Sequence, residues 1–202
     1  MKITFISGSH RVSSQSEKVA RFAMERLSLL EPQWESELMK LAGNPLPLWD
    51  STVWEGGDTW KKLWSPLAQK LQSSDGFVIV SPEWGGMVPP GLKNFFLLCT
   101  GRELGHKPGY LVTVSSSRNG AYPIAELRMS SYKNNSICYL PEHLIVRNAE
   151  KVLNPGEPAG EEDAYLRKRL DFGLSLLMEY TKALAQVRKC GKTFAKEFAN
   201  GR

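Results

Sequence analysis

The sequence has few of the residues that build disulfide frameworks and metal centres. It contains 3 cysteines, Cys99, Cys138 and Cys190, and 3 histidines among its 202 residues. The cysteines are odd in number, lie far apart and form no Cys-x-x-Cys pair, and the histidines do not have the spacing of metal ligands. We therefore expect neither a disulfide-stapled fold nor a metal site.

A long hydrophobic run is also missing. No apolar stretch approaches the roughly 18 residues that a membrane-spanning helix requires. The short apolar start is interrupted by Gly8 and His10, too early for a signal peptide. We expect a cytoplasmic protein without a membrane partner.

Two common phosphate-binding motifs are not present either. No Gly-x-Gly-x-x-Gly follows the first predicted strand, which disfavours a dinucleotide-binding domain of that type. Gly191-Lys192-Thr193 is not the end of a P-loop, because Gln186 stands where the first glycine is required.

What is present is an ordinary globular composition with excess positive charge. Hydrophobic residues make up 42% of the chain, the net charge is +5 and the pI is about 9.1. The length suits one domain, 1–202. Basic residues are spread along the chain except at 167–169 and 188–196. We interpret them as solvated helix faces and expect no nucleic-acid partner.

Strand and helix patterns alternate along the chain. Apolar and β-branched runs predict strands at residues 2–7, 37–41, 76–81, 110–115 and 143–146. Helical periodicity and helix-start signals predict helices at 14–30, 59–71, 91–100, after Pro123 and at 161–189, the last followed by a basic tail. This alternation predicts an α/β fold: a five-stranded parallel sheet in the order 2-1-3-4-5 with helices on both faces. Ligands of such sheets bind beyond the carboxyl ends of the strands, here at loops 7–16, 81–90 and 115–122.

The first of these loops has the residues of an anion site. Residues 7–16, Ser-Gly-Ser-His-Arg-Val-Ser-Ser-Gln-Ser, place hydroxyls, a glycine and one guanidinium between a strand and a helix start. Backbone N–H groups at a helix start favour a phosphate, and Arg11 adds a charge-assisted hydrogen bond. The alternative is that the serines only cap the helix, since Ser14 is followed by Glu17 as in a capping box.

Two segments carry a family resemblance. Gly8-Ser9-His10-Arg11, with Ser14 beyond, resembles the Gly-Ser-x-Arg-x-x-Ser signature of the NADPH-dependent FMN reductase family. Residues 81–89, Ser-Pro-Glu-Trp-Gly-Gly-Met-Val-Pro, and the Leu-Lys-Asn at 92–94 resemble that family's second signature. The resemblance covers about residues 1–150. Trp84 stands at the family's usual tyrosine and Gly85 at its frequent asparagine, which puts contacts to the flavin rim in doubt.

The resemblance implies a flavodoxin-like three-layer sandwich that binds FMN and takes hydride from NADPH, or from NADH, for a small-molecule electron acceptor. The FMN phosphate would be held by Ser9, Arg11, Ser14, Gln15 and Ser16. The flavin ring would be contacted by Pro82, Glu83, Trp84, Gly85 and Gly86, with Ser116 and Ser117 donating from the third loop. No catalytic residue is assigned, because hydride transfer between stacked rings needs orientation more than an acid or base. Glu83 is therefore interpreted as a structural carboxylate.

Two apolar segments suggest association. Phe95-Phe96-Leu97-Leu98-Cys99 is apolar all round, which predicts burial from two sides and a homodimer or homotetramer, although burial within one domain is the alternative. The tryptophans of segment 49–64 would roof the flavin, bury a subunit interface or pack on the core.

Two other functions compete with the reductase. One is a flavodoxin-like electron carrier that binds FMN without nicotinamide turnover, but such carriers usually present an acidic surface, which a pI near 9.1 disfavours. The other is a phosphate-binding or regulatory module without a redox role, which predicts a colourless protein.

Overall fold

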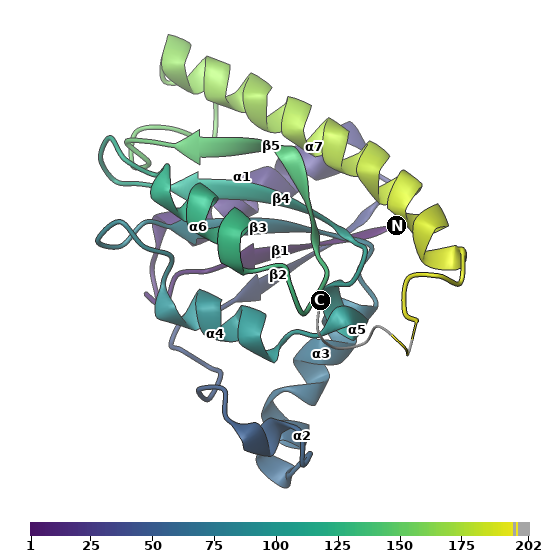
Figure 1. Ribbon diagram of the computed structural model, residues 1–202. Helices are drawn as coiled ribbons and strands as arrows, with labels where there is room; N and C mark the ends of the chain where they lie inside the picture. Colours follow the sequence, from purple (N-terminus) through teal and green to yellow (C-terminus); the bar gives the residue numbers. More distant parts are fainter. Residues whose placement is uncertain (196, 198–202) are drawn as a thin grey trace.

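The computed structural model describes residues 1–195 and 197. At its centre is a sheet of five strands: β1 (Lys2–Ser7), β2 (Glu35–Lys40), β3 (Gly76–Pro82), β4 (Pro108–Val114) and β5 (Cys138–Val146). The strands lie in the order β2-β1-β3-β4-β5, and every neighbouring pair is parallel (Figure 1). The predicted sheet and its strand order are confirmed.

Helices cover both faces of the sheet and give the molecule three layers (Figure 1). One face is covered by α1 (Gln15–Leu30) and α7 (Glu161–Lys189). The other is covered by α2 (Asp58–Leu63), α3 (Ser65–Gln72), α4 (Pro90–Leu98), α5 (Gly101–Leu104) and α6 (Tyr122–Ser130), and a 3-10 helix, η1 (Ser51–Val53), precedes α2. Among the described residues, no helix has the length and apolarity needed to cross a membrane.

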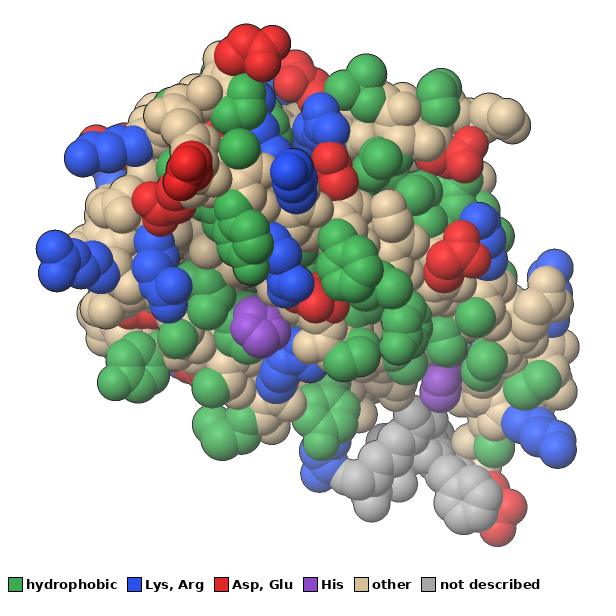
Figure 2. Space-filling view, turned by 90° about the horizontal axis from the view of Figure 1, so that it is seen from above, with side chains coloured by type: hydrophobic (Ala, Val, Ile, Leu, Met, Phe, Trp, Pro, Cys, Tyr) green, Lys and Arg blue, Asp and Glu red, His purple; other side chains and the backbone are tan. Residues whose placement is uncertain are grey.

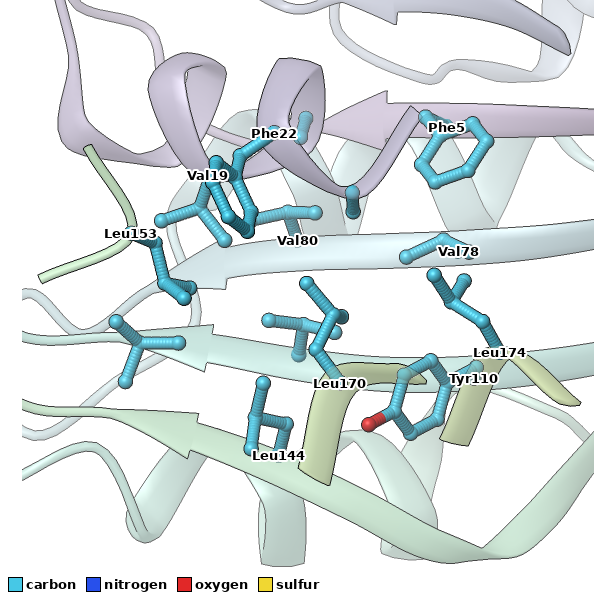
Figure 3. Close-up of a cluster of buried hydrophobic side chains, with 14 of the residues drawn as sticks. Phe5, Val19, Phe22, Val78, Val80, Tyr110, Leu144, Leu153, Leu170 and Leu174 are labelled. Atoms are coloured by element: carbon cyan, nitrogen blue, oxygen red, sulfur yellow. The ribbon is translucent and has the colours of Figure 1, made fainter. Parts of the chain in front are cut away.

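The central strands β3 and β4 are buried along their whole length, as strands covered on both faces must be. Alternate side chains therefore join different cores. Val78, Val80 and Tyr110 face α1 and α7 (Figure 3), whereas Phe77 packs under the helices of the other face. Gly173 lets α7 approach the sheet closely, because a Cβ there would lie 2.2 Å from Tyr110 Cζ.

The predicted helix at 59–71 is two helices. α2 ends at Leu63 and α3 begins at Ser65, because Pro66 has no N–H to donate to the preceding turn. The predicted strand at 143–146 begins earlier, at Cys138, and includes Pro141, which an edge strand tolerates.

The predicted helix at 91–100 is shorter, and its apolar face is covered within the chain. α4 ends at Leu98, and the following turn starts α5 with a capping box between Thr100 and Glu103. Phe95 and Phe96 are buried in the core beneath α4. These two rings therefore do not need a second subunit to cover them.

The basic segment 167–169 is not a freely solvated face. Arg167 donates to a carboxylate oxygen of Asp163 at 3.0 Å, and Arg169 forms an ion pair with Glu142. Figure 2 shows basic, acidic and hydrophobic side chains interspersed on the face seen from above. Of the predicted basic tail at 188–196, Arg188 and Lys189 end α7, and residue 196 lies outside the described residues.

Candidate functional site

A cleft of about 130 Å³ opens where β1, β3 and β4 end. It is lined by Ser9, Arg11, Ser14, Gln15, Ser16, Pro82, Glu83, Trp84, Val114 and Ser116. All of the predicted site residues except Gly85, Gly86 and Ser117 line this cleft. Val114 is the residue that the prediction missed, because the sequence pattern places it inside a strand rather than at its end.

The serines at the start of α1 have different roles. Ser14 is the N-cap residue, and its Oγ accepts a hydrogen bond from Glu17 N at 3.1 Å. Ser9 Oγ accepts from Arg11 N at 3.3 Å. Ser14 and Ser9 thus stabilise the loop itself, as the capping interpretation predicts.

Ser16 has no such role. Its side chain is 1% exposed, and its Oγ has no hydrogen-bond partner within the described part of the chain. Gln15 Oε1 is buried and unpartnered in the same way. A buried polar group without a partner costs about 1 to 3 kcal/mol, so the Ser16 hydroxyl, which can donate, indicates a group kept for a ligand. Gln15 Oε1 can only accept, so it supports a ligand with a donor group and not the phosphate itself. A phosphate fits this place because a hydroxyl and the backbone N–H groups of the first helical turn all donate to anionic oxygens.

The charges around the cleft also suit an anion. Arg11 is exposed, and no described residue forms an ion pair with its guanidinium. The carboxylate of Glu17 is neutralised by Arg21 at 2.8 Å and Lys40 at 3.5 Å. Burial raises the pKa of Glu17, but its hydrogen bonds and ion pairs with Arg21 and Lys40 outweigh this effect and lower it. Within the described part of the chain, Arg11 is therefore a cation of this loop without an ion-pair partner, and the nearby carboxylate of Glu17 is paired.

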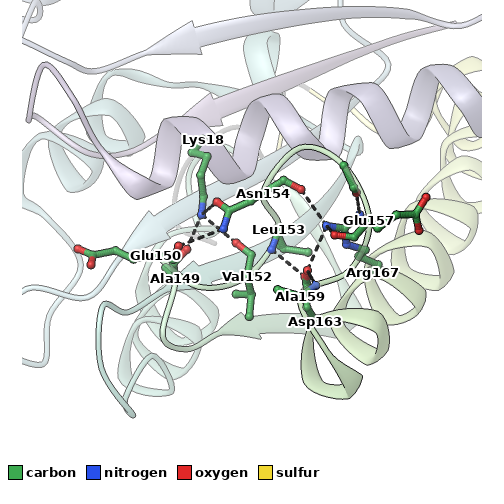
Figure 4. A network of polar contacts seen from close by, with 11 residues as sticks. Lys18, Ala149, Glu150, Val152, Leu153, Asn154, Glu157, Ala159, Asp163 and Arg167 are labelled. Carbon is green, nitrogen blue, oxygen red and sulfur yellow. Dashed lines mark hydrogen bonds and ion pairs between the residues drawn. The ribbon is translucent and has the colours of Figure 1, made fainter.

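Lys18 on α1 does not line the cleft and points toward the loop after β5 (Figure 4). Its Nζ donates to the backbone oxygens of Ala149 and Val152 and to Asn154 Oδ1. Burial lowers the pKa of Lys18. From the other side, Asp163 on α7 accepts from Leu153 N at 2.8 Å.

This held loop supports the third site loop. Asn148 N donates to Ser117 O at 2.9 Å, and Ala149 N donates to Ser115 O at 3.1 Å. Ser117 N donates to Ser115 Oγ at 3.2 Å. The backbone of Ser116, which lines the cleft, is therefore fixed on both sides.

The second loop contains a tight two-residue turn. Trp84 N donates to Met87 O and Met87 N donates to Trp84 O, both at 3.0 Å. Gly85 and Gly86 have φ angles of 57° and 76°, the positive values of a type I′ turn. A Cβ at either position would meet no atom closer than 3.8 Å. The backbone conformation, rather than lack of space, requires glycine here.

Glu83 joins the second loop to the third. Its Oε2 accepts a hydrogen bond from Gly120 N at 2.7 Å. Gly120 has a φ of 113°, and a Cβ there would lie 2.7 Å from Ile145 Cγ2, so the residue is fixed by conformation and by packing. The carboxylate is thus engaged in structure, in agreement with the prediction for Glu83.

Residues 1–151 match the sequence profile of the NADPH-dependent FMN reductase family. The chain belongs to this family. Over 122 residues it is 28% identical to the NADPH azoreductase of Bacillus sp. (strain OY1-2), which covers 59% of this chain and 62% of the relative. The match thus spans about three fifths of the length of that curated relative.

Solved structures agree on the fold. The flavoenzyme NAD(P)H:(acceptor) oxidoreductase FerB from Paracoccus denitrificans superposes with a TM-score of 0.68 at 21% identity, over 89% of this chain and 98% of that one. An oxidoreductase from Corynebacterium diphtheriae also gives 0.68, at 16% identity, over 90% and 97% of the two chains. The family's fold, a flavodoxin-like sandwich, is the fold of this chain.

Proposed function

We propose that this member of the NADPH-dependent FMN reductase family is a single FMN-binding domain that oxidises NADPH and reduces a small acceptor. The acceptor would be a quinone, an azo compound, a metal ion or a free flavin. The observation that carries the proposal is the buried hydroxyl of Ser16 at the start of α1, two positions beyond the family's first signature, which has no hydrogen-bond partner among the described residues.

Two groups of residues would contact different parts of the cofactor. Ser9, Arg11, Ser14, Gln15 and Ser16 would hold the phosphate, and the segment 82–86 with Ser116 and Ser117 would contact the ring. The cleft of about 130 Å³ is smaller than pockets that enclose whole ligands, which run to about 300–1,000 Å³. The enclosed part would therefore be the phosphate end, and the ring would stay accessible to a nicotinamide or an acceptor.

FMN, when bound, supplies the redox chemistry, because it accepts a hydride from a reduced nicotinamide and passes electrons on. The chain supplies binding and orientation. Glu83 Oε2 accepts a hydrogen bond from Gly120 N, so the role proposed for Glu83 is to hold the loop and not to act as a base. The rate of flavin reduction would depend on how rigidly the fold positions the hairpin of Trp84 and the loop at 115–120.

The visible spectrum of the purified protein tests the proposal. A reductase is yellow as purified or after addition of FMN, and NADPH bleaches the flavin band under anaerobic conditions. A yellow protein that dithionite bleaches and neither NADPH nor NADH does would be a carrier. A colourless protein that does not retain added FMN would refute both. Comparing NADPH with NADH at equal concentrations gives the nicotinamide preference.

We also propose that the chain forms a homodimer or homotetramer. A groove of about 400 Å³ lies between α4 and α6, with Val88, Phe96 and Leu127 in its lining. Leu97 at this groove is 63% exposed and Met129 on α6 is 77% exposed. Exposed apolar side chains of this kind suit a face that a second subunit covers. Sedimentation at micromolar concentration tests this, and a monomer would refute it.

The cytoplasmic location stays a prediction, which fractionation of producing cells would check.

A further inference from the structure

The ring of His10 connects two loops of the site that lie far apart in the sequence. His10 follows Ser9 in the first loop but does not line the cleft. Its Nε2 accepts a hydrogen bond from Gly91 N at 2.7 Å, across 81 positions of sequence. Its ring also meets the indole of Trp84 edge-on, with ring centroids 5.2 Å apart and planes at 77°.

The contact with Gly91 completes the start of α4. The N-cap residue, Pro89, makes no side-chain cap hydrogen bond, and Pro90 has no N–H. Leu92 N and Lys93 N donate to Pro89 O, so Gly91 N depends on an acceptor from elsewhere. His10 Nε2 supplies that acceptor.

The His10 ring packs so closely on Gly91 that no side chain would fit at position 91. A Cβ on Gly91 would lie 2.2 Å from His10 Nε2 and 2.9 Å from Cδ2. On the backbone side, His10 O accepts from Gly43 N at 2.9 Å, which ties the same residue to the loop after β2. The imidazole is thus held between the first turn of α4 and the indole of Trp84.

We propose that His10 is a positioning residue, which sets the orientation of Trp84 relative to the phosphate loop. The imidazole links the loop that would hold the phosphate to Trp84 and to the first turn of α4. This inference rests on the proposed function, because it assumes that FMN occupies the cleft. Trp84 contacts the ring in that proposal, so His10 would act on the flavin through Trp84 and not by touching it.

Two substitutions separate the two contacts of the ring. His10→Leu removes both the acceptor and the aromatic edge. His10→Gln keeps an acceptor oxygen the same number of bonds from Cα as Nε2, and loses only the edge contact. His106→Gln is the matched control, because His106 precedes β4, at the end of the strands opposite to the cleft, and its ring packs on Phe194.

Each protein is measured for its FMN dissociation constant and for its rate of flavin reduction by NADPH. The visible circular dichroism of the bound flavin at saturating FMN is measured as well. We expect His10→Gln to weaken FMN binding by about 2- to 10-fold, the scale of one aromatic edge contact, and His10→Leu to weaken it further. The visible dichroism should change in both His10 variants and stay at the parental value in His106→Gln. A loss of fold stability alone would not move that signal at saturation.

The inference is overturned if His10→Leu keeps the parental FMN affinity, dichroism and reduction rate. If His10→Leu does not fold, His10→Gln decides alone, and an unchanged dichroism then overturns the inference. Failure of the parent protein to bind FMN would instead refute the proposed function. The two failures are therefore distinguishable in one set of measurements.

Discussion

Replacing Ser16 with alanine should weaken FMN binding and, at the same time, leave the free protein as stable as before or more so. Ser16 Oγ is buried and has no hydrogen-bond partner among the residues that the structure describes, which costs the free protein about 1 to 3 kcal/mol in desolvation. Ser16→Ala removes that cost, so the free energy of unfolding without FMN should not fall and should rise by up to about 1 kcal/mol. A hydrogen bond to a charged phosphate is worth about 1.5 to 3 kcal/mol, so the FMN dissociation constant should rise about 10- to 150-fold.

Ser14 provides the matched control, because it lies two positions away and its Oγ caps α1. Ser14→Ala should lower the free energy of unfolding by about 0.5 to 2 kcal/mol. Urea unfolding of the two FMN-free variants and titration with FMN, followed by flavin fluorescence, measure both quantities. If Ser16→Ala destabilises the free protein as much as Ser14→Ala and binds FMN like the parent, Ser16 is not kept for a ligand.

Three further predictions concern charged residues. Arg11→Ala should raise the FMN dissociation constant about 10- to 150-fold without changing urea stability, because Arg11 is exposed; unchanged FMN retention would remove it from the site. Glu83→Gln keeps an acceptor for Gly120 N, so stopped-flow flavin reduction should stay within about tenfold of the parent. A thousandfold loss with FMN bound would make Glu83 a chemical participant. Burial, assisted by the charge of Arg188, lowers the pKa of Lys107 from 10.5 to about 8. Between these two pKa values the unfolded chain binds the Lys107 proton more tightly than the folded protein does, so the free energy of unfolding of the parent should rise with pH relative to that of Lys107→Met. Urea unfolding of both proteins at pH 8 and pH 10 would check this difference.

The sheet could be predicted from the sequence because each strand carries its own signal. β3 and β4 are buried on both faces, so their apolar runs are continuous and need no knowledge of their neighbours. The break between α2 and α3 depends on one proline inside an otherwise helical pattern. α5 is a single turn whose capping box follows directly on an apolar run, so the predicted helix 91–100 included its N-cap residue, Thr100, and α5 itself was not predicted.

The sequence predicts which loops form the site, but it does not predict the role of each side chain in them. Glu17 three positions after Ser14 predicts that Ser14 caps α1, but only the direction of the hydroxyl shows that Ser16 Oγ has no partner among the described residues. The contact between His10 and Gly91 joins residues from two loops, and no local pattern signals it. Side-chain direction and long-range pairing both depend on tertiary packing.

The departure at Gly85 from the family's frequent asparagine has a physical explanation in the turn. A type I′ turn needs positive φ at both central residues, and Gly85 and Gly86 have φ angles of 57° and 76°. Asparagine is the residue other than glycine that tolerates such angles best, so either residue preserves the same backbone. What changes is the side chain, because glycine offers no amide at the rim of the cleft. The hairpin therefore keeps its shape in this chain, and under the proposed function recognition of a ring beside it would depend on Trp84 and on backbone groups.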